Sequence, residues 1–304
     1  DGQPLGAADL KVLREICSAD PERLEARIAA VKAGDAPARS ALVQELVDQH
    51  GTGRVMFRNT RTRMKGFPGR RAFFYPLAAV AGQLEAESEV DDADGPRSYR
   101  LSGDPRIEWL SGFLQEHRNE RVLLICRTKE KVLALDEALR ARVNLRIGLF
   151  HEDLTLLQRD RNAAWFAKED GAQILLCSEI GSEGRNFQFA HHLVLFDLPA
   201  NPGLLEQRIG RLDRIGQTET ISIHVPYPEG SRLERLARWY HAGLNAFEKP
   251  LEGAGEIERR LGKRLSSGLR GRGKRAFDTL ITETAALHAR IAGELRAGED
   301  RLLE

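Results

Sequence analysis

The strongest constraint on the fold is a series of short apolar runs that alternates with helical patterns between Pro105 and Tyr240. Strands this apolar must be covered on both faces, as in a parallel sheet wrapped by helices. We therefore expect an α/β fold whose functional side chains lie in loops beyond the carboxyl ends of the strands. The runs are RVLLIC (121–126), LRIGLF (145–150), QILLC (173–177), HLVLFD (192–197) and TISIHV (220–225).

The segments between these runs have the spacing of helices. After the first run, Val132, Leu135 and Leu139 share one helical face. The stretch VLALDEAL around them imitates the strand plus Asp-Glu of a magnesium site, but its strong helix formers predict a helix. Thr155 and Gln158 have the T-x-x-Q spacing of a capping box, which predicts the start of another helix.

The flanking segments define four expected regions. Residues 1–84 are a helical and basic-aromatic segment, and 85–104 form an acidic connector. The sheet occupies 105–247, and 248–304 hold a basic stretch and an amphipathic helix. Within the first region, 54–77 interleave arginines with aromatic side chains. That mixture suits phosphate contacts beside stacking surfaces, and it equally suits a basic linker anchored by its aromatic residues.

The final helix is expected to pack on a part of a longer protein that this chain does not contain. The chain does not begin with Met, which also indicates a piece of a longer protein. The apolar residues of the helix recur at helical spacing: Phe277, Leu280, Ile281, Leu287, Ile291 and Leu295.

Composition limits the classes of function. Lys and Arg number 46 and Asp and Glu 45 among 304 residues, for a net charge of +1, so any nucleic-acid contact must come from local clusters. Cys17, Cys126 and Cys177 have no CxxC spacing, which favours simple packing in a reducing cytoplasm. No apolar run approaches the roughly 18 residues of a membrane span, so we expect no membrane contact.

The chain alone is not expected to hold a complete ATP or metal site. GLRGRGKR (268–275) comes within one residue of the phosphate loop G-x-x-x-x-G-K-[ST]. Arg275 replaces the hydroxyl residue that should bind magnesium, and no strand precedes the stretch. FHED (150–153) and the pair His191 and His192 lack a third and fourth ligand at useful spacing, so we expect no metal site.

Two other stretches have a composition suited to phosphate. The loop after the third strand has two glycines, Gly181 and Gly184, whose backbone amides can approach an anion closely. In LLEQRIGRLDRIGQT (204–218), a helical wheel places three arginines on an arc of about 120° and the apolar residues on another. Geometry alone allows either a solvated basic face or a grip on phosphate. The arginines are Arg208, Arg211 and Arg214, and the apolar residues are Leu205, Ile209 and Leu212.

These stretches, taken in order, resemble a known family. QRIGRLDRIGQ resembles the last arginine motif of superfamily 2 helicases and translocases, and its IGQ ending is similar to that of Swi/Snf-type remodellers. RVLLICRTKEK, ILLCSEIGSEGRNF, LVLFDLPANP and LLEQRIGRLDRIGQ together resemble the complete second RecA-like lobe of such an ATPase. FRNTRTRMKGFPGR and ARWYHAGLNAFE further resemble bacterial members that associate with RNA polymerase. The resemblance covers most of the chain.

The resemblance implies a role for each matching position. Arg211 and Arg214 would be catalytic, reaching ATP bound on a first RecA-like lobe, which would also hold most of the Mg²⁺ site. Cofactor-binding roles fall on Gly181, Glu183, Gly184, Gln207 and Arg208. Nucleic-acid contacts fall on Thr128, Ser178, Asn186, Arg58 and Arg61.

The resemblance also implies a function and its partners. The chain is expected to be the second lobe of an ATP-dependent translocase that promotes RNA polymerase recycling in the bacterial cytoplasm, at the nucleoid, and to be inactive alone. Expected partners are RNA polymerase, the first lobe and DNA, with RNA as a second candidate. Two alternatives stay open: a non-catalytic module that binds nucleic acid or polymerase, and the second lobe of a strand-separating helicase.

Overall fold

A computed structural model describes Ile28 and residues 67–79, 99, 101, 103–182, 186–271 and 273–301. The chain divides into two units, Asp1–Met64 and Lys65–Glu304, and the architecture below is that of the second unit. The expected helices near the amino terminus, the acidic stretch 85–96, and Arg58 and Arg61 lie outside the described residues.

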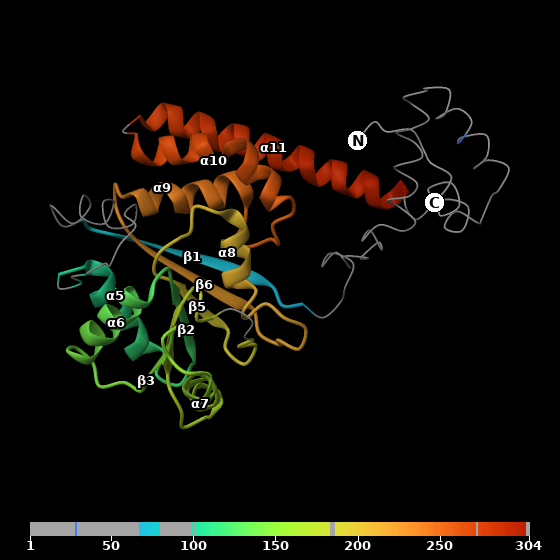
Figure 1. Cartoon of the computed structure of the whole chain (residues 1–304). Helices are drawn as coiled ribbons and strands as arrows, with labels where there is room; N and C mark the ends of the chain where they lie inside the picture. Colours follow the sequence, from blue (N-terminus) through green and yellow to red (C-terminus); the bar gives the residue numbers. More distant parts are fainter. Residues whose placement is uncertain are drawn as a thin grey trace. The chain divides into compact units, whose positions relative to one another are not determined.

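The second unit is built on a six-stranded sheet in which every pairing is parallel (Figure 1). The strand order is β1-β6-β5-β2-β4-β3. The five strands expected from the apolar runs are confirmed, and a sixth, β1, joins them at one edge. The strands are β1 (Arg70–Leu77), β2 (Val122–Cys126), β3 (Ile147–Phe150), β4 (Ile174–Ser178), β5 (His192–Leu195) and β6 (Ile221–Pro228).

Strand β1 comes from the basic, aromatic segment. It pairs with β6 along its whole length, from Arg70 opposite Ile221 to Leu77 opposite Pro228. Its aromatic rings pack inside the unit: Phe74 lies edge-on to Phe247, with ring centroids 5.6 Å apart. This end of the segment is therefore a sheet edge rather than a linker, and the sheet extends beyond the expected start at residue 105.

Helices cover both faces of the sheet, which makes three layers (Figure 1). Alternate residues of β2 belong to two separate cores, with Leu123 in one and Leu124 in the other. Helices α5 (Pro105–Glu116) and α6 (Lys129–Arg140) pack in the core that holds Leu124. On the opposite face lie α7 (Leu156–Ala167), α8 (Pro202–Ile209), α9 (Arg232–Arg238), α10 (Ala254–Arg270) and α11 (Lys274–Arg301).

Capping residues define the starts of the helices that begin at the carboxyl edge of the sheet, after β2, β3 and β5. The capping box of Thr155 and Gln158 is confirmed at the start of α7. The stretch VLALDEAL is confirmed as part of α6, which the Thr128 hydroxyl caps by accepting a hydrogen bond from the backbone N–H of Lys131. Asn201 caps α8 in the same way, and proline occupies its first turn. These caps position the loops that follow β2, β3 and β5.

The carboxyl-terminal helices pack within this unit. A π-helix, η2 (Trp239–Leu244), leads into α10, which lies alongside α11 (Figure 1). The expectation that the final helix packs outside the chain is wrong from Phe277 to Ile291, because α10 and η2 supply an apolar surface for this part of α11. GLRGRGKR joins α10 to α11 and follows no strand. The buried apolar residues of α11 are Phe277, Leu280, Ile281 and Ile291.

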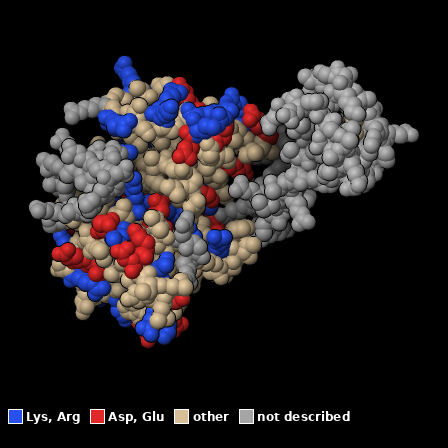
Figure 2. Space-filling model, in the orientation of Figure 1, with Lys and Arg blue, Asp and Glu red and all other residues tan. Residues whose placement is uncertain are grey.

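Charges of both signs are interspersed over the visible face of the described residues (Figure 2). Basic side chains are prominent over α10 and α11, but several are paired. Arg264 of α10 forms an ion pair with Glu283 of α11 at 2.5 Å, and Arg259 pairs with Glu256 at 2.6 Å. No helix in the described part of the chain has both the length and the apolar character of a membrane span.

Candidate nucleotide-facing site

A cavity of about 240 Å³ lies at the carboxyl edge of the sheet, between the turn that follows β4 and helix α8. It brings together the two stretches that the sequence indicated for phosphate. Two arginines and a glutamine line it beside one glutamate, a composition that suits an anionic ligand. The lining residues are Glu179, Ile180, Ser182, Leu204, Gln207, Arg208 and Arg211.

The three arginines do not form a helix face. Helix α8 ends at Ile209, with Gly210 as its C-cap, so Arg211 and Arg214 lie in the turns that follow. Arg208 and Arg211 are buried, whereas Arg214 is exposed. The helical wheel was wrong here because glycine, which has weak helix propensity, ends the helix after two turns. The expected packing of Leu205, Ile209 and Leu212 is confirmed, since all three are fully buried.

Arg208 is held by internal ion pairs. Its Nε donates to Glu179 Oε1 at 2.8 Å, and its Nη1 donates to Asp197 Oδ1 at 2.9 Å. Asp197, which follows β5, also accepts a hydrogen bond from Lys131 Nζ at 2.8 Å. Burial opposes ionisation of Asp197, but Lys131 and Arg208 outweigh it and hold its pKa well below the usual range. Arg208 therefore links α8 to the residues that follow β4 and β5. It is also one of the residues that line the cavity.

Arg70 of β1 fixes the turn that carries Arg211. Its Nε donates to Asp213 Oδ2 at 2.5 Å, and its Nη2 donates to Glu206 Oε1 at 2.6 Å. The side chains of Arg70 and Asp213 are 1% and 0% exposed. Arg70 belonged to the basic segment considered for phosphate contacts, but its guanidinium is used internally. Sequence reasoning missed this role because the two acids that it binds lie more than 130 residues away.

The turn after β4 is held close to β3. The Ser178 hydroxyl donates to Glu152 Oε2 at 2.5 Å and accepts from the Gly181 N–H at 3.0 Å. A Cβ on Gly181 would lie 2.6 Å from the Cα of His151, so only glycine fits this approach. Ser178 is 1% exposed. Its hydroxyl is hydrogen-bonded to Glu152 and Gly181, so it does not face solvent, where the predicted nucleic-acid contact would require it.

The remaining predicted positions are spread over several segments, and some of them lie outside the described residues. Thr128 is half-buried at the start of α6, and Asn186 is exposed, with its side chain bonded to Gln188. Gln207 is exposed at the cavity. Glu183 and Gly184 lie outside the described residues, as do Arg58 and Arg61. The structure thus brings Gly181, Gln207, Arg208 and Arg211 to one place and leaves the nucleic-acid assignments as predictions.

The parallel sheet with helices on both faces is the fold of a RecA-like helicase C-terminal lobe. Residues 105–216 match the family model described as helicase conserved C-terminal domain, which contains both stretches that line the cavity. Residues 220–304 match a second model, described as RNA polymerase recycling family C-terminal. The two matches lie in different parts of the chain, and neither spans half of it.

The chain is homologous to RNA polymerase-associated proteins named RapA, which confirms the resemblance seen in the sequence. It is 49% identical to the RapA of Pseudomonas putida strain F1 over 92% of the chain and 31% of that protein. It is 47% identical to the RapA of Pseudomonas aeruginosa strain LESB58 over its whole length and 33% of that protein. The chain therefore spans about a third of the length of these curated relatives.

Two solved structures show a distant likeness to this chain. The Sulfolobus solfataricus SWI2/SNF2 ATPase core in complex with dsDNA is 13% identical, with a TM-score of 0.46 over 78% of this chain and 57% of that one. The C-terminal part of the Fun30 ATPase domain is 18% identical, with a TM-score of 0.40 over 60% of this chain and 54% of that one. At TM-scores this low, the likeness carries no inference.

Proposed function

We propose that this chain is the second lobe of an ATP-driven nucleic-acid translocase that associates with RNA polymerase and promotes its recycling. Arg211 and Arg214 would act on ATP bound by a first lobe of the same protein. The observation that carries the proposal is the cavity in which the glycine turn after β4 faces the arginine-bearing end of α8. The two matched families and the RapA relatives support the same reading.

Arg211 is the residue best placed for the chemistry. It lines the cavity although it is only 8% exposed, and its turn is anchored by the hydrogen bond from the Phe187 N–H to the Arg211 carbonyl at 2.8 Å. A guanidinium held in a poorly solvated wall stabilises the charge that develops on a transferring phosphoryl group. Such an arginine is worth about 10³ to 10⁵ in rate. Arg214, which is exposed, would complete the contact from the next turn.

The donor chemistry of the site fits the phosphates of ATP. Two arginines, Arg208 and Arg211, and the amide-bearing Gln207 are among the residues that line the cavity. Bound ATP with Mg²⁺ would supply the phosphoryl group and part of its charge neutralisation. The acids that pair with Arg208 are committed to that arginine and to Lys131, so we assign the magnesium ligands to the first lobe.

A reconstitution experiment distinguishes the proposed ATPase lobe from a non-catalytic binding module. The chain alone, the chain joined to an ATP-binding first lobe, and the first lobe alone would be assayed for ATP hydrolysis with and without DNA or RNA. We expect hydrolysis only in the joined protein, stimulated by nucleic acid. Hydrolysis by the isolated chain at the rate of the joined protein would overturn the split site. Polymerase binding without any hydrolysis in the joined protein would favour the binding module.

A further inference from the structure

Four histidines, one glutamate and one tyrosine form a continuous polar network that begins at the amino edge of the sheet, opposite the cavity, and extends along β6 and β1 to Tyr75. Glu120 precedes β2, His117 is the C-cap of α5, and His192 is the first residue of β5. Sequence spacing indicated no partners for the pair His191 and His192, but the fold supplies them from a segment about 70 residues away.

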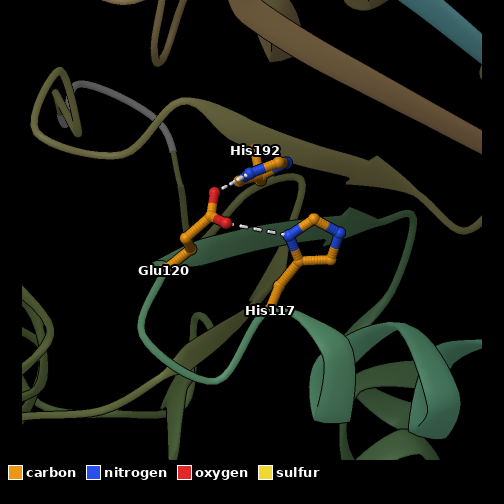
Figure 3. A group of neighbouring side chains, drawn as sticks. All are labelled: His117, Glu120 and His192. Carbon is orange, nitrogen blue, oxygen red and sulfur yellow. Dashed lines mark hydrogen bonds and ion pairs between the residues drawn. The ribbon is translucent and has the colours of Figure 1, made fainter.

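Three imidazole rings converge on the carboxylate of Glu120. His117 Nδ1 lies 3.0 Å from Oε1, and His191 Nε2 lies 3.0 Å from Oε2. His192 Nε2 also bonds to Oε2, and Figure 3 shows the Glu120 carboxylate between His117 and His192. One ligand atom from each of these three residues lies within 4.8 Å of the others.

We propose that His117, Glu120 and His192 bind a divalent transition-metal ion of the Zn²⁺ type, with water as the fourth ligand. Imidazole nitrogen and carboxylate oxygen are standard zinc ligands, at about 2.0 to 2.2 Å. A tetrahedron with such bonds places its ligands roughly 3.3 Å apart. The ligand atoms of His117 and Glu120 are now 3.0 Å apart, and all three ligand atoms lie within 4.8 Å of one another. Small side-chain rotations would therefore open the position for the ion.

The surroundings orient the buried ligand. His192 Nδ1 lies 2.9 Å from His224 Nε2, and His224 Nδ1 lies 2.9 Å from the hydroxyl of Tyr75. When His192 Nε2 binds a metal, its Nδ1–H donates to His224, whose Nδ1–H donates to Tyr75. A ligating histidine commonly gives its other N–H to such an acceptor, which fixes the ring orientation. Because Tyr75 is only half-buried, its hydroxyl proton can turn toward solvent.

The proposed metal site is partly open to solvent, so an ion can enter it, and one of its ligands, His192, is buried. The side chain of His192 is 8% exposed, whereas those of His117, His191 and Glu120 are 29%, 30% and 38% exposed. Bound metal would join the end of α5 to the starts of β2 and β5. Its role in this place is structural, since it lies at the edge of the sheet opposite the proposed nucleotide-facing cavity.

The test is titration of the chelator-treated chain with Zn²⁺ by calorimetry and with Co²⁺ by visible spectroscopy. We expect one ion per chain and the intense absorption of tetrahedral Co²⁺. Glu120→Gln and His192→Gln should each weaken binding by at least about 10-fold. His288→Gln, a change on α11 outside the network, should leave the affinity within about twofold.

Circular dichroism would show that each variant is folded, and Glu120→Gln is the safer variant because its side chain is partly exposed. The absence of saturable binding, or equal affinity in the wild type and both ligand variants, would overturn the proposal. ATP hydrolysis in the joined protein is a separate measurement, so failure of the metal site leaves the proposed function untouched.

Discussion

Replacing Arg70 with methionine tests whether strand β1 anchors the turn that carries Arg211. The change keeps much of the side-chain volume and removes the guanidinium. Asp213 would then be a carboxylate whose side chain is 0% exposed and has lost its 2.5 Å partner, whereas Glu206 is 29% exposed and keeps water. Removal of one partner from a buried ion pair costs about 3 to 5 kcal/mol. Nearly all of this loss in stability comes from the buried Asp213 carboxylate, because Glu206 remains partly solvated.

The expected change in melting temperature follows from the size of the folded unit. A loss of 1 kcal/mol lowers the Tm of a domain of this size by about 2 to 4 °C, so Arg70→Met should lower it by about 6 to 20 °C. Arg71→Met is the matched control, since it removes the same charge from the neighbouring position of the same strand. Arg71 is exposed and contacts the Phe73 ring, which is worth under about 1 kcal/mol.

Thermal unfolding followed by circular dichroism, with urea unfolding as a second measure, would compare the two variants. A double variant, Arg70→Met with Asp213→Asn, should lose less stability than the sum of its single changes, because the buried carboxylate that loses the Arg70 ion pair is gone. Equal losses in Arg70→Met and Arg71→Met would refute the claim that Arg70 is an internal anchor.

Three further changes test the neighbouring structure. Gly181→Ala should destabilise the lobe and weaken ATP hydrolysis, because its Cβ meets backbone atoms of His151, whereas Gly112→Ala in α5 meets nothing within 4 Å and should add about 0.5 to 1 kcal/mol in urea unfolding. The depressed pKa of Asp197 contributes stability above the unfolded carboxyl pKa of about 4, and this is lost as the pH falls toward the folded value. Asp197→Asn should therefore lower stability at pH 7 and flatten its decline between pH 4 and acid, and an unchanged pH profile would contradict the ion-pair assignment. Thr155→Ala removes the capping box and should cost about 1 kcal/mol by the same unfolding assay, and no loss would mean that α7 is held by packing alone.

Local chemistry explains what the sequence could predict. The five apolar strands, helix α6 and the capping box of Thr155 depend on neighbouring residues, and all appear in the structure. The order of the motifs also placed the glycine turn and the arginines at one edge, because the carboxyl ends of parallel strands meet there.

What the sequence did not predict depends on contacts between distant residues. Strand β1 was not predicted, because its arginines and aromatic rings also suit a surface that binds phosphate. Only the pairing with β6 distinguishes a strand from such a surface. The partners of Arg70 and the ring of imidazoles around Glu120 likewise join segments far apart in the chain. Helix α8 ended earlier than the wheel assumed, which moved Arg211 into a buried turn and Arg214 into solvent.

The central claim is that Arg211 acts on ATP held by another lobe. Its most direct test is single-turnover ATP hydrolysis and ATP binding by Arg211→Ala in the protein that joins this chain to a first lobe, beside Arg259→Ala, which removes an exposed arginine of α10. We predict that Arg211→Ala lowers the hydrolysis rate by about 10³ to 10⁵ and leaves the Kd for ATP within about threefold. Arg259→Ala should change neither quantity. An unchanged hydrolysis rate in Arg211→Ala would contradict the assignment.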